Sequence, residues 1–243
     1  MRSLKINDYA KHLALFKNLI RTKQLSPVSR TPVPAGKKEI DIADIRHSLN
    51  DIKARFPEIN ERLKTKRENF TDKVLDNLVS AYEHLNVLLA RKTEFQAMDV
   101  FDLNLKVHLG DKCSDYIEYN GMIINNKDQF CKGIGSLWKW YKNNLTASPW
   151  EKAAGVYVRT LSYPQLFFEG NHRTAALVMC YIFVNEGLPP FVLNQKNAVY
   201  FLDLSSDIKH STKNLGFKLH ISKLRGYQKE LERFLIKNYP PES

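Results

Sequence analysis

The sequence QLFFEGNHR at residues 165–173, followed by TAALVMCYIFVNE at residues 174–186, organises the fold of this chain. The second stretch is apolar on every face of a helix until Gly187, Pro189 and Pro190 end it. A helix that is hydrophobic all round is buried, so this one is predicted to lie at the centre of its domain. Gly170 and Asn171 tolerate unusual backbone angles, which predicts a tight turn into that helix.

Further helical patterns surround the central stretch. Apolar residues recur at three- and four-residue spacing after Thr71, which predicts a core helix. Ser148-Pro149-Trp150-Glu151 is a capping box with proline at the first helical position, so a helix starts there and runs to about Ser162. Other helices are expected over residues 98–109 before Gly110, over about 127–144, over 198–204 after a cap at Asn194, and over 219–239.

One segment predicts a β-hairpin in this otherwise helical chain. An Asn-Gly pair separates two short β-prone arms, and Asn-Gly best meets the positive φ that a type I′ turn needs at both central residues. The hairpin comprises Tyr116, Ile117, Glu118, Tyr119, Asn120, Gly121, Met122, Ile123 and Ile124.

The predicted organisation has four parts. Residues 1–38 hold a short amphipathic helix over 5–25 and a Pro-rich connector, because Pro27, Pro32, Pro34 and Gly36 cannot continue a helix. Residues 39–70 form a charged, weakly periodic helical segment that is expected on the surface. Residues 71–210 form the core domain, and residues 211–243 add a C-terminal helix.

The turn before the central helix has the chemistry of a phosphate site. The first N–H groups of a helix are unpaired, and with the helix dipole they attract anions. Arg173 adds a guanidinium fork suited to phosphate oxygens, and Glu169 is a carboxylate of the kind that holds the Mg²⁺ of a diphosphate. Alternatively, Gly170 and Asn171 form only a turn before a helix, and Glu169 and Arg173 only a local ion pair.

This turn resembles the motif of the Fic family, H-x-F-x-[D/E]-G-N-G-R-x-x-R. The matching positions are Phe167, Glu169, Gly170, Asn171 and Arg173, and the resemblance covers about residues 70–210. It implies an all-α fold with a hairpin flap that docks a target protein, and transfer of AMP or another phosphoryl-containing group to a protein hydroxyl. It also implies a magnesium ligand at Glu169, backbone phosphate contacts at Gly170, Asn171 and His172, and a phosphate clamp at Arg173.

Three positions depart from that motif. Gln165 replaces the family's general-base histidine, a loss typically worth roughly 10²–10⁴-fold in rate. Ala176 replaces the second arginine, which weakens the case for ATP in the family's usual pose and leaves room for another diphosphate-containing donor. His172 replaces a glycine, and it has three interpretations: a phosphate contact when protonated, a displaced acid or base, or a solvent-facing bystander.

Two aromatic residues have weaker claims to a functional role. Trp140 is an exposed candidate for stacking on a base, whereas Trp138 and Tyr141 have core spacing. Tyr163 is a possible target of self-modification, but packing is its expected role.

The composition limits the kinds of binding partner that are expected for this protein. The formal net charge is +11, and residues 1–70 hold sixteen Lys and Arg against eight Asp and Glu, which favours polyanions or nucleotides as partners. Three widely spaced cysteines suggest neither a disulfide framework nor a zinc site. The longest apolar run, residues 175–184, is too short to span a bilayer, so a cytoplasmic protein is expected, with export by a dedicated system left open.

The sequence therefore leaves three functions open. The first is a transferase that binds a nucleotide or other diphosphate donor and acts on a protein hydroxyl without the family histidine. The second is an inactive nucleotide sensor or protein-binding module. The third is association with nucleic acid through the basic N-terminal arm.

Overall fold

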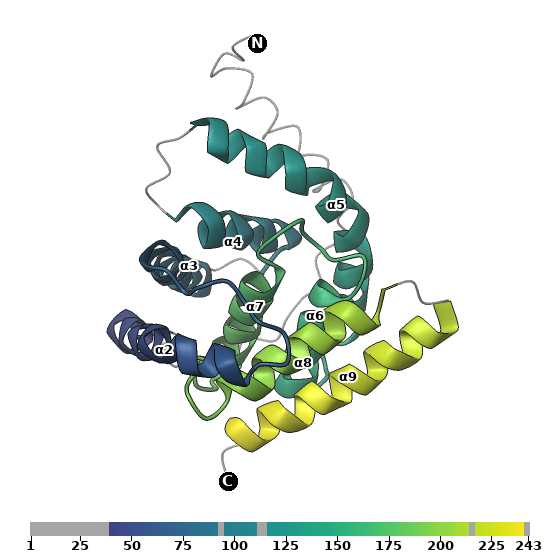
Figure 1. Ribbon diagram of the computed structural model, residues 1–243. Helices are drawn as coiled ribbons and strands as arrows, with labels where there is room; N and C mark the ends of the chain where they lie inside the picture. The colour runs from purple at the N-terminus through teal and green to yellow at the C-terminus, as the bar shows by residue number, and fades with distance from the viewer. Residues whose placement is uncertain (1–38, 92–94, 111–115, 214–216, 241–243) are drawn as a thin grey trace.

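The computed structural model of the protein describes residues 39–91, 95–110, 116–213 and 217–240 (Figure 1). Within those ranges every regular element is a helix, so the fold is all-α, as the sequence predicted. The helices are α2 (Ile42–Arg62), α3 (Asp72–Ala90), α4 (Ala97–Leu109), α5 (Tyr116–Asn143), α6 (Pro149–Leu161), α7 (Asn171–Asn185), α8 (Ala198–Ser211) and α9 (Phe217–Asn238). The helix and connector expected over residues 5–38 lie outside the described residues.

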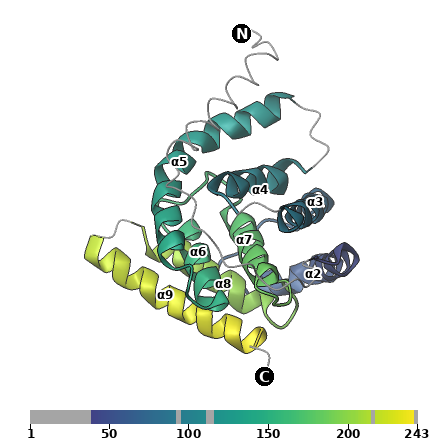
Figure 2. The same ribbon diagram turned by 180° about the vertical axis from the view of Figure 1, so that it is seen from behind.

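Helix α7 lies at the centre of the bundle. It packs against α6, α4 and α3, and Figures 1 and 2 show it enclosed by the other helices from both sides. Eleven of its fifteen residues are buried, including Phe183, Cys180 and Met179, which have no exposed surface. Burial of apolar surface is the main favourable contribution to folding, so this continuous apolar helix fixes the positions of its neighbours. The prediction of a central buried helix is confirmed.

Local signals set several helix ends as expected, although the N-cap residue of α8 is Asn197 and not Asn194. The Thr71 side chain accepts a hydrogen bond from the backbone N–H of Val74, and Ser148 accepts one from Glu151. Such N-cap bonds satisfy donors that the first helical turn leaves unpaired. Gly110 follows α4 with φ at 60°, a conformation that glycine adopts at little cost.

Helix α2 corrects the expectation of a surface segment. It has a buried face, which consists of Ile45, Leu49, Ile52, Phe56 and Ile59. These residues recur every three or four positions, so they form one stripe that packs on α3 and α8. The outer face carries so many charged residues that the apolar periodicity of the segment was weak in the sequence.

The predicted β-hairpin is wrong. Residues 116–124 form the first turns of α5, with Gly121 and Ile124 inside the helix (Figure 1). Two short arms joined by Asn-Gly form a hairpin only if they pair, and an isolated hairpin is marginal in water. The helix downstream is anchored in the core by Phe130, Ile134 and Leu137. Extending an existing helix adds one hydrogen bond per residue, so helix formation prevailed over a local turn preference.

Across the described ranges, no helix combines the length and the apolar character needed to cross a membrane.

Candidate functional site

The turn before α7 depends on Gly170. This residue has φ at 76° and precedes the first residue of the helix. A Cβ atom at Gly170 would lie 2.4 Å from His108 Nε2 and 2.8 Å from Asn104 Nδ2. The position therefore needs glycine for two reasons, the left-handed backbone and the close approach of α4.

Side-chain amides hold the rest of the loop. Asn171 accepts a hydrogen bond from the Phe167 N–H and donates one to the Phe167 carbonyl oxygen, both at 2.8 Å. Asn104 donates to the Glu169 carbonyl oxygen at 3.0 Å. Asn126 accepts from the Phe168 N–H at 2.8 Å. The side chain of Asn171 thus shapes the loop, a role that the sequence did not predict for it.

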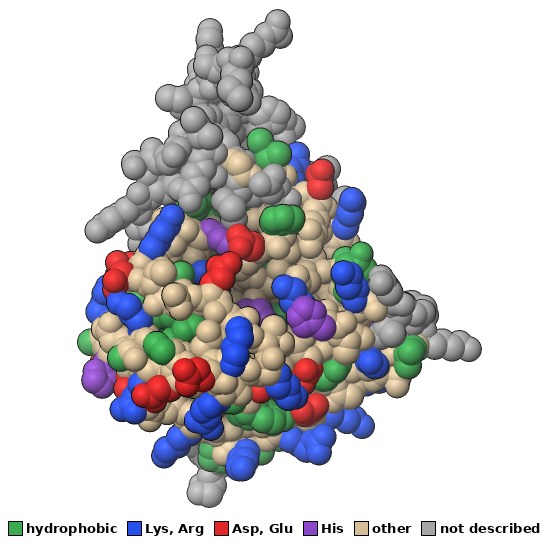
Figure 3. Space-filling view, in the orientation of Figure 1, with side chains coloured by type: hydrophobic (Ala, Val, Ile, Leu, Met, Phe, Trp, Pro, Cys, Tyr) green, Lys and Arg blue, Asp and Glu red, His purple; other side chains and the backbone are tan. Residues whose placement is uncertain are grey.

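The loop opens onto a cavity of about 440 Å³. Its walls come from α2, α3, α7, α8 and the segments before α3 and after α7. Six residues predicted for the site line it together, as does Ala176: Gln165, Glu169, Gly170, Asn171, His172 and Arg173. Figure 3 shows blue and purple side chains beside a hollow near the centre of one face. A cavity of this volume is in the range of small-molecule sites.

Two cations that the sequence did not single out also line this cavity. Arg67 comes from the segment between α2 and α3, and Lys209 comes from α8. Arg67 donates to the Leu202 carbonyl oxygen at 2.8 Å and to the Ser206 hydroxyl at 3.0 Å, and its Nη2 lies 3.5 Å from His172 Nε2. Its Nε is buried without a hydrogen-bond partner in the described part of the chain. Burial lowers the pKa of Arg67 because it disfavours the charged guanidinium, so a nearby anion would stabilise that charge.

The charge of Arg173 would also be stabilised by a nearby anion. It lies in the first turn of α7, where the helix dipole disfavours a cation. Burial lowers the pKa of its guanidinium, an effect that Glu169 and Glu68 oppose. Its one hydrogen-bond contact in the described ranges is long, at 3.5 Å from Nη1 to the Val107 carbonyl oxygen.

His172 is held in one tautomer by a chain of hydroxyl groups. Ser205 donates its proton to the Phe201 carbonyl oxygen at 2.6 Å, so it accepts from the Tyr157 hydroxyl at 2.5 Å. The Tyr157 oxygen then accepts from His172 Nδ1 at 3.1 Å. Because Nδ1 carries the proton, Nε2 has the lone pair and faces Arg67.

The surroundings of His172 also keep it neutral. Its pKa is well below 6.5, first because of burial and then because of Arg67, Lys209 and Arg173. Of the three interpretations of His172, the solvent-facing bystander is wrong, since the ring is hydrogen-bonded and lines the cavity. A phosphate contact and an acid or base role remain.

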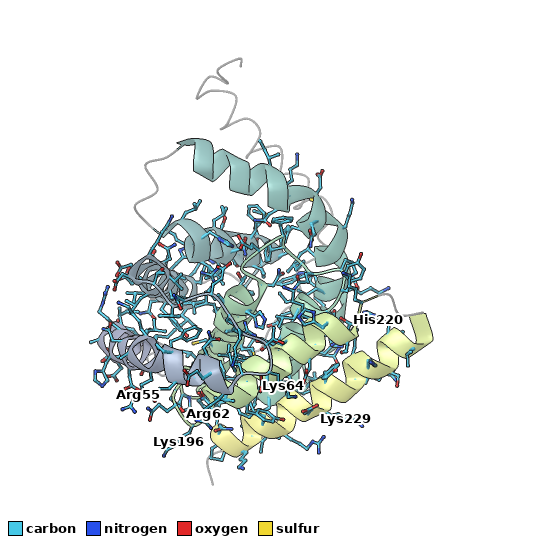
Figure 4. All side chains as sticks on the ribbon, viewed as in Figure 1. Arg55, Arg62, Lys64, Lys196, His220 and Lys229 are labelled. Atoms are coloured by element: carbon cyan, nitrogen blue, oxygen red, sulfur yellow. The ribbon has the colours of Figure 1, made fainter. Side chains whose placement is uncertain are left out.

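The cavity differs from the outer surface in how its cations are paired. Figure 4 labels two cations of the outer surface, Lys64 and Arg55. Lys64 lies 3.1 Å from Asp207, and Arg55 lies 3.0 Å from Asp51. None of the ion pairs among the described residues includes Arg67, Arg173 or Lys209. Glu169 and Arg173 thus lack the local ion pair that was one interpretation of the loop.

A magnesium ion would depend on Glu169. This carboxylate lines the cavity and is exposed. Within the described residues, no group of three or more His, Cys, Asp or Glu side chains is close enough to hold a metal ion. Mg²⁺ is commonly bound by one or two carboxylates together with substrate phosphates, so Glu169 fits it only with a phosphorylated ligand present.

The aromatic candidates are not part of this cavity lining. Trp140 packs against α6, where Gly155 makes room for its ring and Arg159 stacks over it at 3.9 Å. It is therefore not a free platform for a base. Tyr163 is 48% exposed, in the segment between α6 and the loop.

Sequence reasoning missed Arg67, Lys209 and Tyr157. Arg67 lies 105 positions from His172, in a segment, residues 62–67, in which four of six residues are basic and which gave no local sign of function. Tyr157 has the spacing of an ordinary core residue on α6 and is fully buried. No signal within a few residues of these positions could have connected them.

Comparison with known proteins adds a weak structural similarity. No protein-family model matches the chain, and no curated protein matches it. Among solved structures, it is similar to a Fic-domain-containing signalling protein from Bacteroides thetaiotaomicron, with a TM-score of 0.46 and 14% sequence identity. The match covers 96% of this chain and 90% of that one. A similarity at this level assigns neither family nor activity, so the function must be argued from the site.

Proposed function

We propose that this protein binds a phosphorylated small molecule, a nucleotide or another diphosphate-containing compound, with its phosphates at the start of α7. One observation carries the proposal. Arg67, Arg173 and Lys209 converge with His172 on a ligand-sized cavity, and none of the three cations is in an ion pair within the described chain. Arg67 and Arg173 are partly buried, whereas Lys209 is exposed. A charge that is partly buried is costly unless it is paired, and a phosphate would supply the missing partner of the two guanidinium groups.

The helix contributes to the same site. The first N–H groups of α7 are not capped by a side chain at the N-cap position, since that residue is Gly170. These donors and the helix dipole favour an anion at this end. Arg67 supplies a second guanidinium in a site where Ala176 replaces the second arginine of the Fic motif.

Glu169 is the residue that we assign to magnesium. When bound with a diphosphate, the ion would neutralise phosphate charge. Glu169 lines the cavity beside the first turn of α7, so its carboxylate belongs to the same site as the cations.

Calorimetric titration with pyrophosphate, ADP and ATP, with and without Mg²⁺, tests the anion site. Arg67→Ala and Arg173→Ala should each weaken binding by about tenfold or more, because charge-assisted hydrogen bonds contribute roughly 1.5–3 kcal/mol. Arg62→Ala is the matched control, because Arg62 is an exposed arginine at the end of α2 (Figure 4). Absence of binding to every anion, or equal binding by the wild type and both cavity variants, would contradict the proposal.

The lone pair of His172 Nε2 favours a second candidate, transfer of a nucleotidyl or phosphoryl-containing group to a protein hydroxyl. In the nucleotidyl case the hydroxyl oxygen bonds to the α-phosphorus, the bond to the bridging oxygen breaks, and pyrophosphate leaves. The hydroxyl proton passes to Nε2, which takes the place of the histidine that Gln165 replaces. A bound phosphate would raise the pKa of His172 and so make it a stronger base.

Labelled donors separate transfer from binding alone. The purified protein is incubated with labelled ATP and candidate target proteins, and His172→Ala should abolish any labelling. If no protein is labelled, even by the Gln165→His variant, while pyrophosphate still binds, the protein is a binding module without chemistry.

A further inference from the structure

The cavity has two chemically distinct ends. The cations lie at the first turn of α7, and beyond them the walls are apolar. The apolar lining includes Ala176 and Leu177, which lie about one turn further along α7. Side chains from the other three helices complete it, and they include Leu49 and Ile52 of α2, Val74 and Leu78 of α3, and Phe201 and Leu202 of α8.

The helices at the apolar end offer no free side-chain donor or acceptor. Glu68 and Asn69, in the segment before α3, also line the cavity, and both are exposed. Tyr82 carries the one polar side-chain atom among the helical residues of this wall. Its hydroxyl already donates to the Phe191 carbonyl oxygen at 3.2 Å. Burial raises the pKa of Tyr82 well above its ordinary value, so the hydroxyl stays neutral. The backbone groups of this wall lie mostly within helices, where they bond to one another.

The apolar wall favours some groups over others as the part of the ligand that is attached to the phosphate. A nucleobase has ring nitrogens and exocyclic groups along its edges, and each polar group buried without a partner is penalised. A hydrocarbon chain gains free energy from the same wall, because apolar surface leaves water. The cationic end still requires a phosphate or diphosphate head.

We propose that the ligand is a small amphiphile, a phosphate or diphosphate ester of an alkyl or prenyl chain, whose chain enters the apolar end. The inference rests on the proposed anion site, and it specifies which class of phosphorylated compound binds there. The head lies among Arg67, His172, Arg173 and Lys209, and the chain runs along the second turn of α7 between α2, α3 and α8.

A chain-length series tests the apolar end. Calorimetry compares inorganic phosphate with ethyl, butyl and hexyl phosphate, and uses AMP as a phosphate ester with a polar body. Affinity should rise about fourfold per added methylene until the cavity is full. Hexyl phosphate should bind more tightly than AMP. Equal affinity across the series, or tighter binding of AMP than of hexyl phosphate, overturns the inference.

Two substitutions on the cavity wall locate the chain. Val74→Phe and Ala176→Leu enlarge half-buried side chains, so both variants should fold, and circular dichroism checks this. Within each protein, the affinity ratio of hexyl to inorganic phosphate is the readout. It should fall at least tenfold in either variant and stay unchanged in Ala43→Leu, an exposed position on α2. A ratio that is unchanged in both wall variants also overturns the inference.

The outcomes separate the inference from the proposed function. Pyrophosphate binding that depends on Arg67 and Arg173, without any chain-length effect, refutes only the amphiphile. If Arg67→Ala and Arg173→Ala bind every phosphate of the series as tightly as the wild type does, the anion site on which the inference depends is refuted.

Discussion

His172 combines a fixed tautomer with a suppressed positive charge. Tyr157 determines which nitrogen holds the proton, and burial with Arg67, Lys209 and Arg173 lowers the pKa of the ring. The cations of the proposed phosphate site therefore also keep the neighbouring imidazole neutral, and a bound phosphate would offset their effect on its pKa. This coupling has a measurable effect on stability.

The first prediction concerns pH. In the unfolded chain His172 binds a proton near its ordinary pKa of 6.5, whereas in the folded protein its pKa is well below that value. The unfolded state thus binds more protons below pH 6.5, so the free energy of unfolding falls as the pH is lowered. The loss is at most about 1.4 kcal/mol per pH unit. Urea unfolding at pH 7.5 and pH 5.5 measures it.

His172→Gln supplies the comparison. This variant has no titratable group at that position, so it should lose less stability between the two pH values than the wild type. Equal losses would show that His172 is not held neutral in the folded protein.

The second prediction concerns Gly170. Gly170 and Gly187 both have positive φ, at 76° and 83°, but a Cβ atom at Gly187 would meet nothing within 4 Å. Gly187→Ala should destabilise the protein by about 1 kcal/mol through backbone strain alone. In Gly170→Ala the new Cβ atom would also clash with His108 and Asn104. Overpacking typically costs about 1–3 kcal/mol, so this variant should lose about that much more stability than Gly187→Ala. Thermal unfolding of both variants checks this, and equal effects would contradict it.

At the scale of elements, a buried ion pair joins α6 to the end of α7. Lys152 Nζ lies 2.5 Å from Glu186 Oε1, and the two side chains are 7% and 32% exposed. Lys152 also lies 3.4 Å from the Leu145 carbonyl oxygen. The pair fixes the C-terminal end of the central helix, opposite the end at which we propose the anion site.

The third prediction follows from the unequal burial of this pair. Glu186→Gln leaves a buried ammonium without its counter-charge, so it should cost about 3 kcal/mol of stability. Lys152→Met leaves a carboxylate that can turn toward water and places a hydrophobic side chain in the buried position, so it should cost less. Chemical denaturation ranks the two variants. The reverse order would mean that Glu186, not Lys152, is the more strongly desolvated partner.

At the scale of the whole molecule, the cavity exists only because distant segments pack together. The chain before α2 is tied to α3 by two hydrogen bonds between Ile40 and Asn86, each 2.8 Å long. A second apolar cluster joins α2 to α8, and it consists of Ile52, Phe56, Ile59, Leu63, Ala198 and Leu202. These contacts position Arg67 and Lys209 over the start of α7.

The fourth prediction is stabilisation by ligand. A ligand that binds only the folded protein at 100 times its Kd adds about 2.7 kcal/mol of stability. For a chain of this length the Tm should rise by roughly 5–10 °C in saturating pyrophosphate. The Arg67→Ala/Arg173→Ala double variant should show no rise, and sodium chloride at matched ionic strength controls for general salt effects. A rise of the same size in the double variant would place the anion elsewhere.

The extent to which the sequence predicted the molecule differs among its elements. The start of α6 was predictable because its capping box lies within four residues, and α7 because its apolar character is continuous. The hairpin over residues 116–124 failed because a local turn preference lost to extension of a helix anchored further downstream. The buried face of α2 was missed because its outer face carries most of the charge.

The sequence by itself determined the all-α fold, the central helix and the turn at Gly170, because caps, periodicity and backbone freedom act over a few residues. It also placed Gln165 and Glu169 on one loop, and His172 and Arg173 in the first turn of the helix that follows it. Only the tertiary structure decided that Arg67 and Lys209 join them and that an apolar wall faces them. Those contacts join residues far apart in the chain, and their positions depend on how α2 and α8 pack around α7.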